Sequence, residues 1–263
     1  MLLTDPPYNV DYNSKNEYLT EIDKANRVLT AIKGDKMTTT GYRKLLEDAF
    51  RAAKEVLKPG GAFYVWSAQG HEMTNVAHAL DSVGLVFRQQ IIWAKNSLVL
   101  GRMDYQCKHE PCYYGWKDGA HFFRDTRSET TVIPDAAELD LKKMKKEEMY
   151  DLLKKMKKEE MYDLLKKMLS DDTPTTVIKE NKPARSELHP TMKPVRLFGR
   201  LITNSSRPGE TVLDLFGGSG TTIIAAEQLG RRCCMMEYDP HYCDVILSRW
   251  EKMTGRQAVR ITG

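Results

Sequence analysis

The chain has 263 residues, of which 41% are hydrophobic and 29% are charged, so it is long enough to bury one sizeable α/β core with or without an insertion. Its net charge of +4 excludes a strongly basic or acidic protein, and no apolar run approaches the ~20 residues that a membrane helix needs. The five cysteines form an odd set without a disulfide framework, which favours reduced thiols in the cytoplasm. Cys107, His109 and Cys112 have no second matching pair, so we expect no metal site.

The chain starts with a short apolar segment that ends in a double proline. Leu2–Thr4 predicts a strand stub, and Asp5, Pro6, Pro7 and Tyr8 follow it. The prolines lack N–H donors and fix φ, so their carbonyls stay available as acceptors. Together with the Asp5 carboxylate and the flat Tyr8 ring, this turn offers a site for an amino group on a planar base. A capped turn with a packed tyrosine is the alternative interpretation.

Helix and strand patterns alternate after this turn. Residues 42–57 have the i, i+3, i+4 apolar spacing of an amphipathic helix, which the Pro and Gly residues of 58–61 end. Residues 62–66 predict a buried strand, residues 75–80 lie in a second helix, and residues 83–93 predict one or two further strands. Such alternation predicts an α/β fold with a mostly parallel sheet and helices on both faces.

The periodic pattern fades between residue 98 and about residue 128, where aromatic and cationic side chains are interleaved. This mixture suits base stacking with phosphate contact, and it suits a small loop-rich subdomain equally well.

A tandem repeat follows, because residues 142–153 recur identically as residues 154–165. Residues 142–167 hold ten lysines against six acids, so the whole positive excess of the chain lies there. Each copy has a helical apolar stripe, but a shift of twelve residues rotates the second stripe by about 120°. We therefore expect a kink near 153–156 or a long helix whose second stripe meets another surface. Contact with DNA is the alternative, and we expect an accessory arm outside the chemistry.

A strand, a glycine turn and a helix come near the end of the chain. Residues 212–215 end a strand, Gly217, Gly218 and Gly220 interrupt it, and residues 221–229 resume at helical spacing. This unit binds nucleotides at the carboxyl ends of strands, and glycine lets a ligand approach the backbone closely. A plain structural turn is the alternative, and a P-loop is not indicated because no lysine follows the last glycine.

The next predicted strand, at residues 231–237, ends in Glu237, 17 positions beyond Gly220. An acid about 20 residues beyond such a turn suits hydrogen bonds to ribose hydroxyls, and an ordinary surface glutamate is the alternative. We also expect a helix at 195–205, a helix from Asp239 to Trp250 and an edge strand at 258–261.

Three motifs occur in a definite order: D-P-P-Y from Asp5 to Tyr8, H-P-T-M-K-P from His189 to Pro194, and D-L-F-G-G-S-G from Asp214 to Gly220. In these motifs and their order the chain resembles the β-group DNA amino-methyltransferases, close to those of phages and prophages. The resemblance covers nearly the whole chain apart from the lysine-rich repeat. It implies a Rossmann-like methyltransferase fold in which 1–114 form the catalytic half, 115–188 a helical and loop insertion for target recognition, and 189–263 the cofactor half.

The resemblance implies transfer of a methyl group from S-adenosylmethionine to the exocyclic N6 of a flipped adenine in double-stranded DNA. The residues it assigns to catalysis are Asp5, Pro6, Pro7 and Tyr8, with Asp5 and the Pro6 carbonyl accepting from the amino group and Tyr8 stacking on the base. The residues it assigns to the cofactor are His189, Thr191, Lys193, Asp214, Phe216, Gly217, Gly218, Ser219, Gly220 and Glu237. Trp93, Lys95 and Asn96 resemble a W-x-K-N segment near the target base. No metal is needed.

Several alternatives stay open. Cytosine-N4 methylation shares this scaffold, although Asp rather than Ser before Pro-Pro-Tyr resembles the adenine enzymes more. Cytosine-C5 chemistry would need Cys112, which we place outside any strand–turn context, and a glutamine-methylating protein enzyme has a different motif order. A catalytically silent DNA-binding subunit is an alternative of another class.

The resemblance further implies a cytoplasmic enzyme of a bacterial or phage-infected cell, with restriction-modification as one role and a homodimer as one possible assembly. Only four residues precede Asp5. Either these suffice for the central strand, or the chain lacks a preceding segment.

Overall fold

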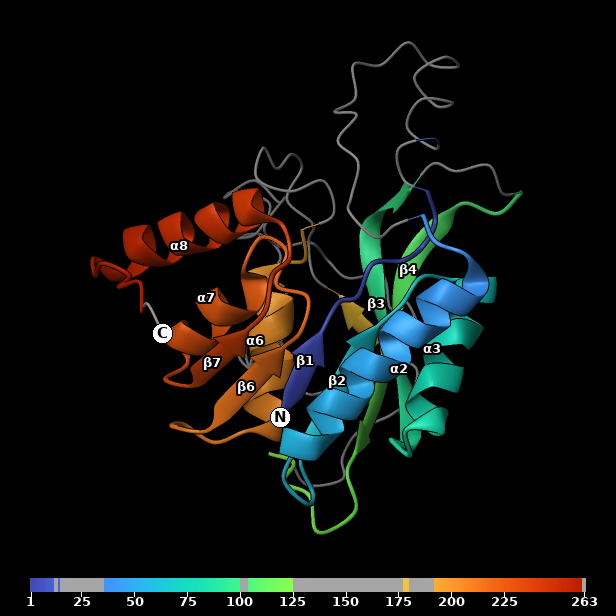
Figure 1. Ribbon diagram of the computed structural model, residues 1–263, viewed down its shortest axis with the longest axis horizontal. Helices are drawn as coiled ribbons and strands as arrows, with labels where there is room; N and C mark the ends of the chain where they lie inside the picture. Colours follow the sequence, from blue (N-terminus) through green and yellow to red (C-terminus); the bar gives the residue numbers. More distant parts are fainter. Residues whose placement is uncertain (12–13, 15–35, 100–103, 125–176, 180–191, 262–263) are drawn as a thin grey trace, which may run out of the picture.

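The computed structural model describes residues 1–11, 14, 36–99, 104–124, 177–179 and 192–261 (Figure 1). In chain order the elements are β1 (Leu2–Thr4), α2 (Thr39–Val56), β2 (Ala62–Trp66), α3 (His71–Ser82), β3 (Phe87–Val99), β4 (Cys107–Trp116), β5 (Val177–Lys179), α6 (Val195–Ser205), β6 (Thr211–Asp214), α7 (Thr221–Gln228), β7 (Arg232–Met235) and α8 (Pro240–Thr254). None of the helices in these ranges is long and apolar enough to cross a membrane.

The strands form one seven-stranded sheet in the order β5-β3-β4-β2-β1-β6-β7. The pairs β1–β2, β1–β6, β6–β7 and β3–β5 are parallel, whereas β4 runs antiparallel to both of its neighbours. The strand stub β1 therefore lies inside the sheet and joins the first part of the chain to the last. The expectation of a mostly parallel sheet is confirmed.

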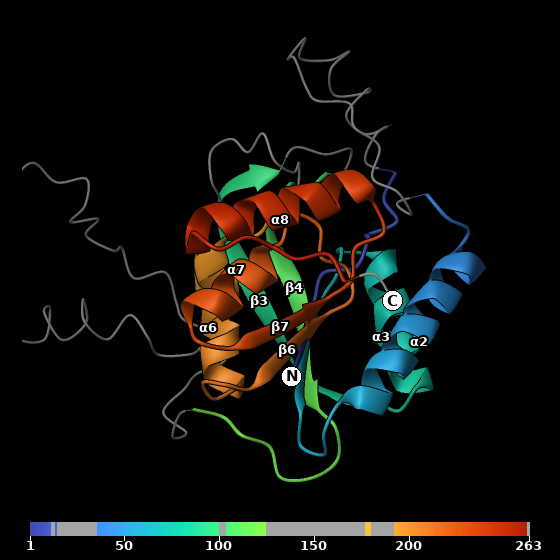
Figure 2. The same cartoon turned by 60° about the vertical axis from the view of Figure 1, so that its left-hand side comes forward.

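Helices cover both faces of this sheet, because successive strand residues point to opposite sides. Leu2, Phe63 and Val65 pack with buried residues of α2 and α3, whereas Leu3 and Tyr64 pack with buried residues of α6 and α7. Figure 2 shows these two helix pairs on opposite sides of the sheet, with α8 outside α7. The Rossmann-like α/β architecture is confirmed.

Most of the predicted elements form at the expected places. The predicted helix at 42–57 is α2, the predicted strand at 62–66 is β2, and the predicted helix at 195–205 is α6. The edge strand expected at 258–261 is wrong, because this exposed tail has no strand. The tandem repeat lies outside the described residues.

The main correction concerns residues 107–116, which were expected to be irregular and instead form β4 in the interior of the sheet. Pro111 and Gly115 hide this strand from pattern analysis, because both residue types disfavour strand interiors. Gly115 is required here, since a Cβ would lie 2.5 Å from the Phe63 ring and 2.7 Å from the Val86 carbonyl. The expected domain boundary at 114 falls inside this strand.

Cys112 is consequently a strand residue, and its expected position outside a strand is wrong. Its side chain is fully buried in the core, and burial raises the pKa of its thiol well above the ordinary range. A buried thiol of this kind is a poor nucleophile. Among the described residues, no group of three or more His, Cys, Asp or Glu side chains is placed to hold a metal.

Candidate active site

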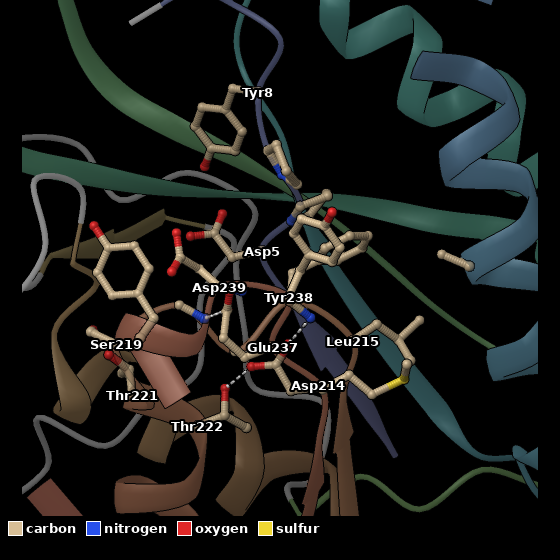
Figure 3. A pocket seen from close by; sticks show the side chains of 18 of the residues that line it. Asp5, Tyr8, Asp214, Leu215, Ser219, Thr221, Thr222, Glu237, Tyr238 and Asp239 are labelled. Atoms are coloured by element: carbon tan, nitrogen blue, oxygen red, sulfur yellow. Dashed lines mark hydrogen bonds between the residues drawn. The ribbon is translucent and has the colours of Figure 1, made fainter. Parts of the chain in front are cut away.

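One cavity of about 690 Å³ opens at the carboxyl edge of the parallel strands. Residues that follow β1, β6 and β7 line it, as expected for an α/β sheet with this strand order. Figure 3 shows Asp5, Tyr8 and Glu237 around this cavity. The structure therefore brings the first and last motifs of the sequence to one site.

The double-proline turn forms the wall of the cavity nearest β1. Asp5, Pro6, Pro7 and Tyr8 all line it. The Tyr42 hydroxyl on α2 donates a 2.7 Å hydrogen bond to the Pro7 carbonyl, which fixes the turn against the helix. Asp5 Oδ1 is buried and has no hydrogen-bond partner among the residues that the structure describes. A buried acceptor without a partner is costly, so this atom is suited to receive a donor from a ligand.

Behind this wall lies a buried ionic cluster. The Lys193 ammonium lies 2.5 Å from Asp5 Oδ2, 3.0 Å from Glu110 Oε2 and 3.0 Å from the Tyr8 hydroxyl. The Tyr8 hydroxyl donates to Glu110 Oε2 at 3.1 Å, and the ammonium of Lys95 pairs with Glu110 Oε1. The cluster thus contains two carboxylates and two ammonium groups, and its formal charges balance.

The two carboxylates of the cluster differ in acidity. Burial acts to raise the pKa of Glu110, but the ammonium groups of Lys193 and Lys95 outweigh it and lower the pKa to about 2. Burial raises the pKa of Asp5, Lys193 opposes that rise, and the charge of Glu110 adds to it. For Lys193, burial lowers the pKa, and the two carboxylates outweigh burial so that the net shift is upward. Glu110 is therefore firmly ionised, and Asp5 is the more basic carboxylate.

The glycine turn after β6 forms the opposite wall. Gly218 and Gly220 have φ of +52° and +80°, which glycine adopts without a Cβ penalty. At Gly217 a Cβ would lie 2.7 Å from the Met235 sulfur, so the turn packs directly on β7. Arg249 of α8 donates to the Ser219 carbonyl and holds the turn from outside.

Asp214, at the end of β6, is 2% exposed and is engaged by the protein itself. It accepts a hydrogen bond from the Thr4 hydroxyl at 2.7 Å. It also accepts from the Thr222 hydroxyl at 2.5 Å and from the Phe216 amide at 3.1 Å (Figure 3). Burial raises its pKa to about 7 despite these donors. These hydrogen bonds hold β1, β6 and α7 together around the glycine turn.

Glu237 follows β7 on the cavity wall and braces the same turn. Its Oε2 accepts from the Gly218 amide at 2.7 Å, and its Oε1 accepts from the Asp239 amide at 2.8 Å. Each carboxylate oxygen can accept a further hydrogen bond, so these contacts leave capacity for a ligand.

Most of the predicted site residues that the structure describes line the cavity, but Gly220, in the glycine turn, and Lys95, in the ionic cluster, do not. Lys193, Phe216 and Ser219 line the cavity, whereas His189 and Thr191 lie outside the described residues. Trp93 is buried in the core. Sequence reasoning missed three groups: Glu110, the α2 residues Leu45, Asp48, Ala49 and Ala52, and the aromatic side chains Tyr238 and Tyr242. The four α2 residues have i, i+3, i+4, i+7 spacing, which places them on one face of the helix. This spacing is visible in the sequence and could have identified that face.

Comparison with known families gives one broad match. The model of a family described as DNA methylase, N6_N4_Mtase, matches residues 1–248. A type II methyltransferase of Streptococcus pneumoniae, M2.DpnII, is 28% identical over 254 residues, which cover 95% of this chain and 82% of that protein.

Solved structures with the same fold include two of low sequence identity. The complex of M1.HpyAVI with SAM superposes with a TM-score of 0.56 at 19% identity, covering 94% of this chain and 87% of the other. The PvuII DNA methyltransferase, described as cytosine-N4-specific, gives a TM-score of 0.61 at 15% identity, covering 95% and 78%. At such low sequence identities, the similarity shows a shared fold and nothing more.

Proposed function

Because this chain belongs to the N6_N4_Mtase family of DNA methylases, we propose that it transfers a methyl group from S-adenosylmethionine to the N6 amino group of an adenine flipped out of duplex DNA. The observation that carries the proposal is Asp5, which lines the same cavity as the glycine turn and Glu237 and whose buried Oδ1 has no hydrogen-bond partner among the described residues. The base must leave the duplex to reach such a cavity, at a cost of a few kcal/mol.

The residues of the cavity fit S-adenosylmethionine. Its volume of about 690 Å³ lies within the roughly 300–1,000 Å³ of small-molecule sites. Gly217 and Gly218 bring the backbone close to the ligand space, the Glu237 carboxylate suits ribose hydroxyls, and Tyr238 and Tyr242 offer aromatic faces. When bound, the cofactor supplies a methyl group on a positively charged sulfur, which is a good leaving group.

The amino group of adenine is a poor nucleophile because its lone pair is delocalised into the ring. Asp5 Oδ1 and the Pro6 carbonyl accept hydrogen bonds from its two N–H groups. These contacts favour a pyramidal nitrogen with an available lone pair. Tyr8 stacks on the base, and the ionic cluster holds its hydroxyl. Positioning and electrostatics carry catalysis, so no covalent intermediate on the protein is required.

The N6 assignment rests on Asp5, since Asp before Pro-Pro-Tyr resembles the adenine enzymes. Cytosine-N4 is the second candidate, favoured by the likeness to the cytosine-N4-specific PvuII enzyme, because both bases present an amino group beside a ring nitrogen. A silent DNA-binding subunit is the remaining alternative.

The test incubates the protein with duplex DNA and methyl-labelled S-adenosylmethionine, and analyses the nucleosides by mass spectrometry. We expect labelled N6-methyladenine. Asp5→Asn should lower kcat at least ~100-fold, the usual effect of losing one hydrogen-bonding group at a reacting centre, while DNA affinity stays within about two-fold. Glu227→Gln, a carboxylate change on α7 at a residue that does not line the cavity, is the matched control and should be neutral.

Label found only in N4-methylcytosine would transfer the assignment to the second candidate. Wild-type protein that binds DNA without forming either product would favour the silent subunit.

A further inference from the structure

Glu110 is the centre of the ionic cluster although it does not line the cavity. Its side chain is 17% exposed and contacts both Lys95 and Lys193, and it also accepts a hydrogen bond from the Tyr8 hydroxyl. Because β4 is antiparallel, its first half lies at the edge where the parallel strands end, which brings Glu110 next to the residues that follow β1.

Lys193 uses its full donor capacity on three oxygens. An ammonium group has three N–H bonds, and here Asp5, Glu110 and Tyr8 receive them. Two carboxylates therefore share this ammonium, but they share it unequally. Both carboxylates contact the Tyr8 hydroxyl, but Glu110 pairs with a second ammonium, that of Lys95, whereas Lys193 is the one ammonium that pairs with Asp5 among the described residues. Asp5 Oδ1 is buried without a hydrogen-bond partner among these residues.

If Lys193 were not shared between two carboxylates, Asp5 would be less available to accept a hydrogen bond from a ligand. A buried lysine with one carboxylate partner pairs with it closely, and a second contact of the ammonium with Asp5 would occupy Oδ1 as well as Oδ2. With Glu110 as a second counter-ion, the ammonium is held between the two carboxylates, so it engages one oxygen of Asp5 only.

We propose that Glu110 is a positioning residue for the transfer: it is the standing counter-ion of Lys193, and in this way it keeps Asp5 Oδ1 free to accept the amino group of the target base. The proposal rests on the proposed function for its catalytic consequence. The difference in acidity between the two carboxylates supports it, because groups whose environments separate their pKa values commonly have separate roles.

The first test is a double-mutant cycle with Glu110→Gln and Lys193→Met, measuring kcat and KM for DNA. Glu110→Gln keeps the size of the side chain and an acceptor for Tyr8 but removes its charge. We expect kcat to fall at least ten-fold, with KM for DNA and cofactor affinity within about two-fold. In the Lys193→Met background the same change should lower kcat less than two-fold, because Glu110 acts through Lys193.

The second test needs no turnover. The Asp5 carboxyl is titrated by ¹³C NMR in the wild type and in Glu110→Gln. The ionisable side chains that surround Asp5 are Lys193, Glu110, Tyr8, Asp214 and Cys112, and only Glu110 changes. In Glu110→Gln, Lys193 has Asp5 as its one carboxylate partner in the cluster, so the pKa of Asp5 should be lower than in the wild type by at least half a unit. Glu227→Gln is the control and should leave this titration unchanged.

Additive losses in the cycle, a kcat within two-fold of wild type, or an unmoved Asp5 titration would each overturn the proposal. If Glu110→Gln does not fold, Lys95→Met/Glu110→Gln removes both charges of one ion pair and should give the same low kcat and lowered titration. A wild type that transfers no methyl group would refute the proposed function, and the NMR titration would still decide the role of Glu110.

Discussion

Glu237 holds two backbone amides and faces the cavity at the same time, so its carboxylate both shapes the glycine turn and offers acceptors to a ligand. Glu237→Ala should weaken S-adenosylmethionine binding by roughly 1.5–3 kcal/mol, the usual contribution of a charge-assisted hydrogen bond. Titration calorimetry would measure it.

An analogue without ribose hydroxyls separates direct contact from bracing of the turn. If Glu237 holds these hydroxyls, the analogue should bind more weakly than the parent to the wild type and equally well to the variant. Equal affinity ratios in both proteins would restrict Glu237 to the bracing role.

At the scale of single residues, the sequence predicted those parts of the site that are contiguous with a recognisable turn. Asp5 and Tyr8 flank the double proline, and Glu237 ends a strand at the expected spacing from Gly220. Glu110 has no such local signal, because its role depends on Lys95 and Lys193, which are distant in the sequence and meet it only after the sheet forms.

At the scale of elements, β1, β6 and α7 meet at Asp214. Its pKa of about 7 in the folded protein exceeds the ordinary value of 3.8, so folding favours its protonated form. The resulting stability is fully present below about pH 3.8 and is lost as the pH rises to about 7. The loss should be on the order of a few kcal/mol, since one pKa unit corresponds to about 1.4 kcal/mol.

Asp214→Asn should abolish this pH dependence while keeping the hydrogen bonds, because an amide can accept from Thr4 and donate to the Thr222 hydroxyl. Urea unfolding at pH 5 and pH 8 would measure it: the wild type should lose more stability over this interval than the variant. Asp214→Ala, which removes the hydrogen bonds, should be destabilised at both pH values. Identical pH dependence in wild type and Asp214→Asn would contradict the expectation.

The strands of the sheet illustrate which elements could be predicted. β2 and β6 show apolar runs bounded by glycine, and α2 and α6 show helical spacing, so their positions were evident. β4 was missed because Pro111 and Gly115 interrupt its pattern, although the apolar residues between them were visible. Pairing with β2 and β3 in the folded sheet determines the strand conformation of β4, whereas the local sequence propensity does not.

At the scale of the whole molecule, the first and last parts of the chain share one sheet through β1 and β6. The Met1 amino group donates to the Thr211 carbonyl at 2.9 Å, and the Leu213 amide donates to the Met1 carbonyl at 2.9 Å. A third contact joins β2 in the first part to α6 in the last part: the hydroxyls of Tyr64 and Ser205 form a 2.7 Å hydrogen bond. Because both parts also line the cavity, a bound ligand contacts both and should stabilise them together.

We therefore expect one cooperative thermal transition that S-adenosylmethionine shifts as a unit. At a free concentration 100-fold above Kd, binding adds about 2.7 kcal/mol. For a domain of this size, each kcal/mol raises Tm by roughly 2–4 °C, so a rise of about 5–10 °C is expected. Differential scanning calorimetry with and without cofactor would measure it, with Glu237→Ala as a control that needs more ligand for the same shift. Two transitions, of which the cofactor moves only one, would show that the catalytic and cofactor halves fold independently, and the shared sheet would then not couple them.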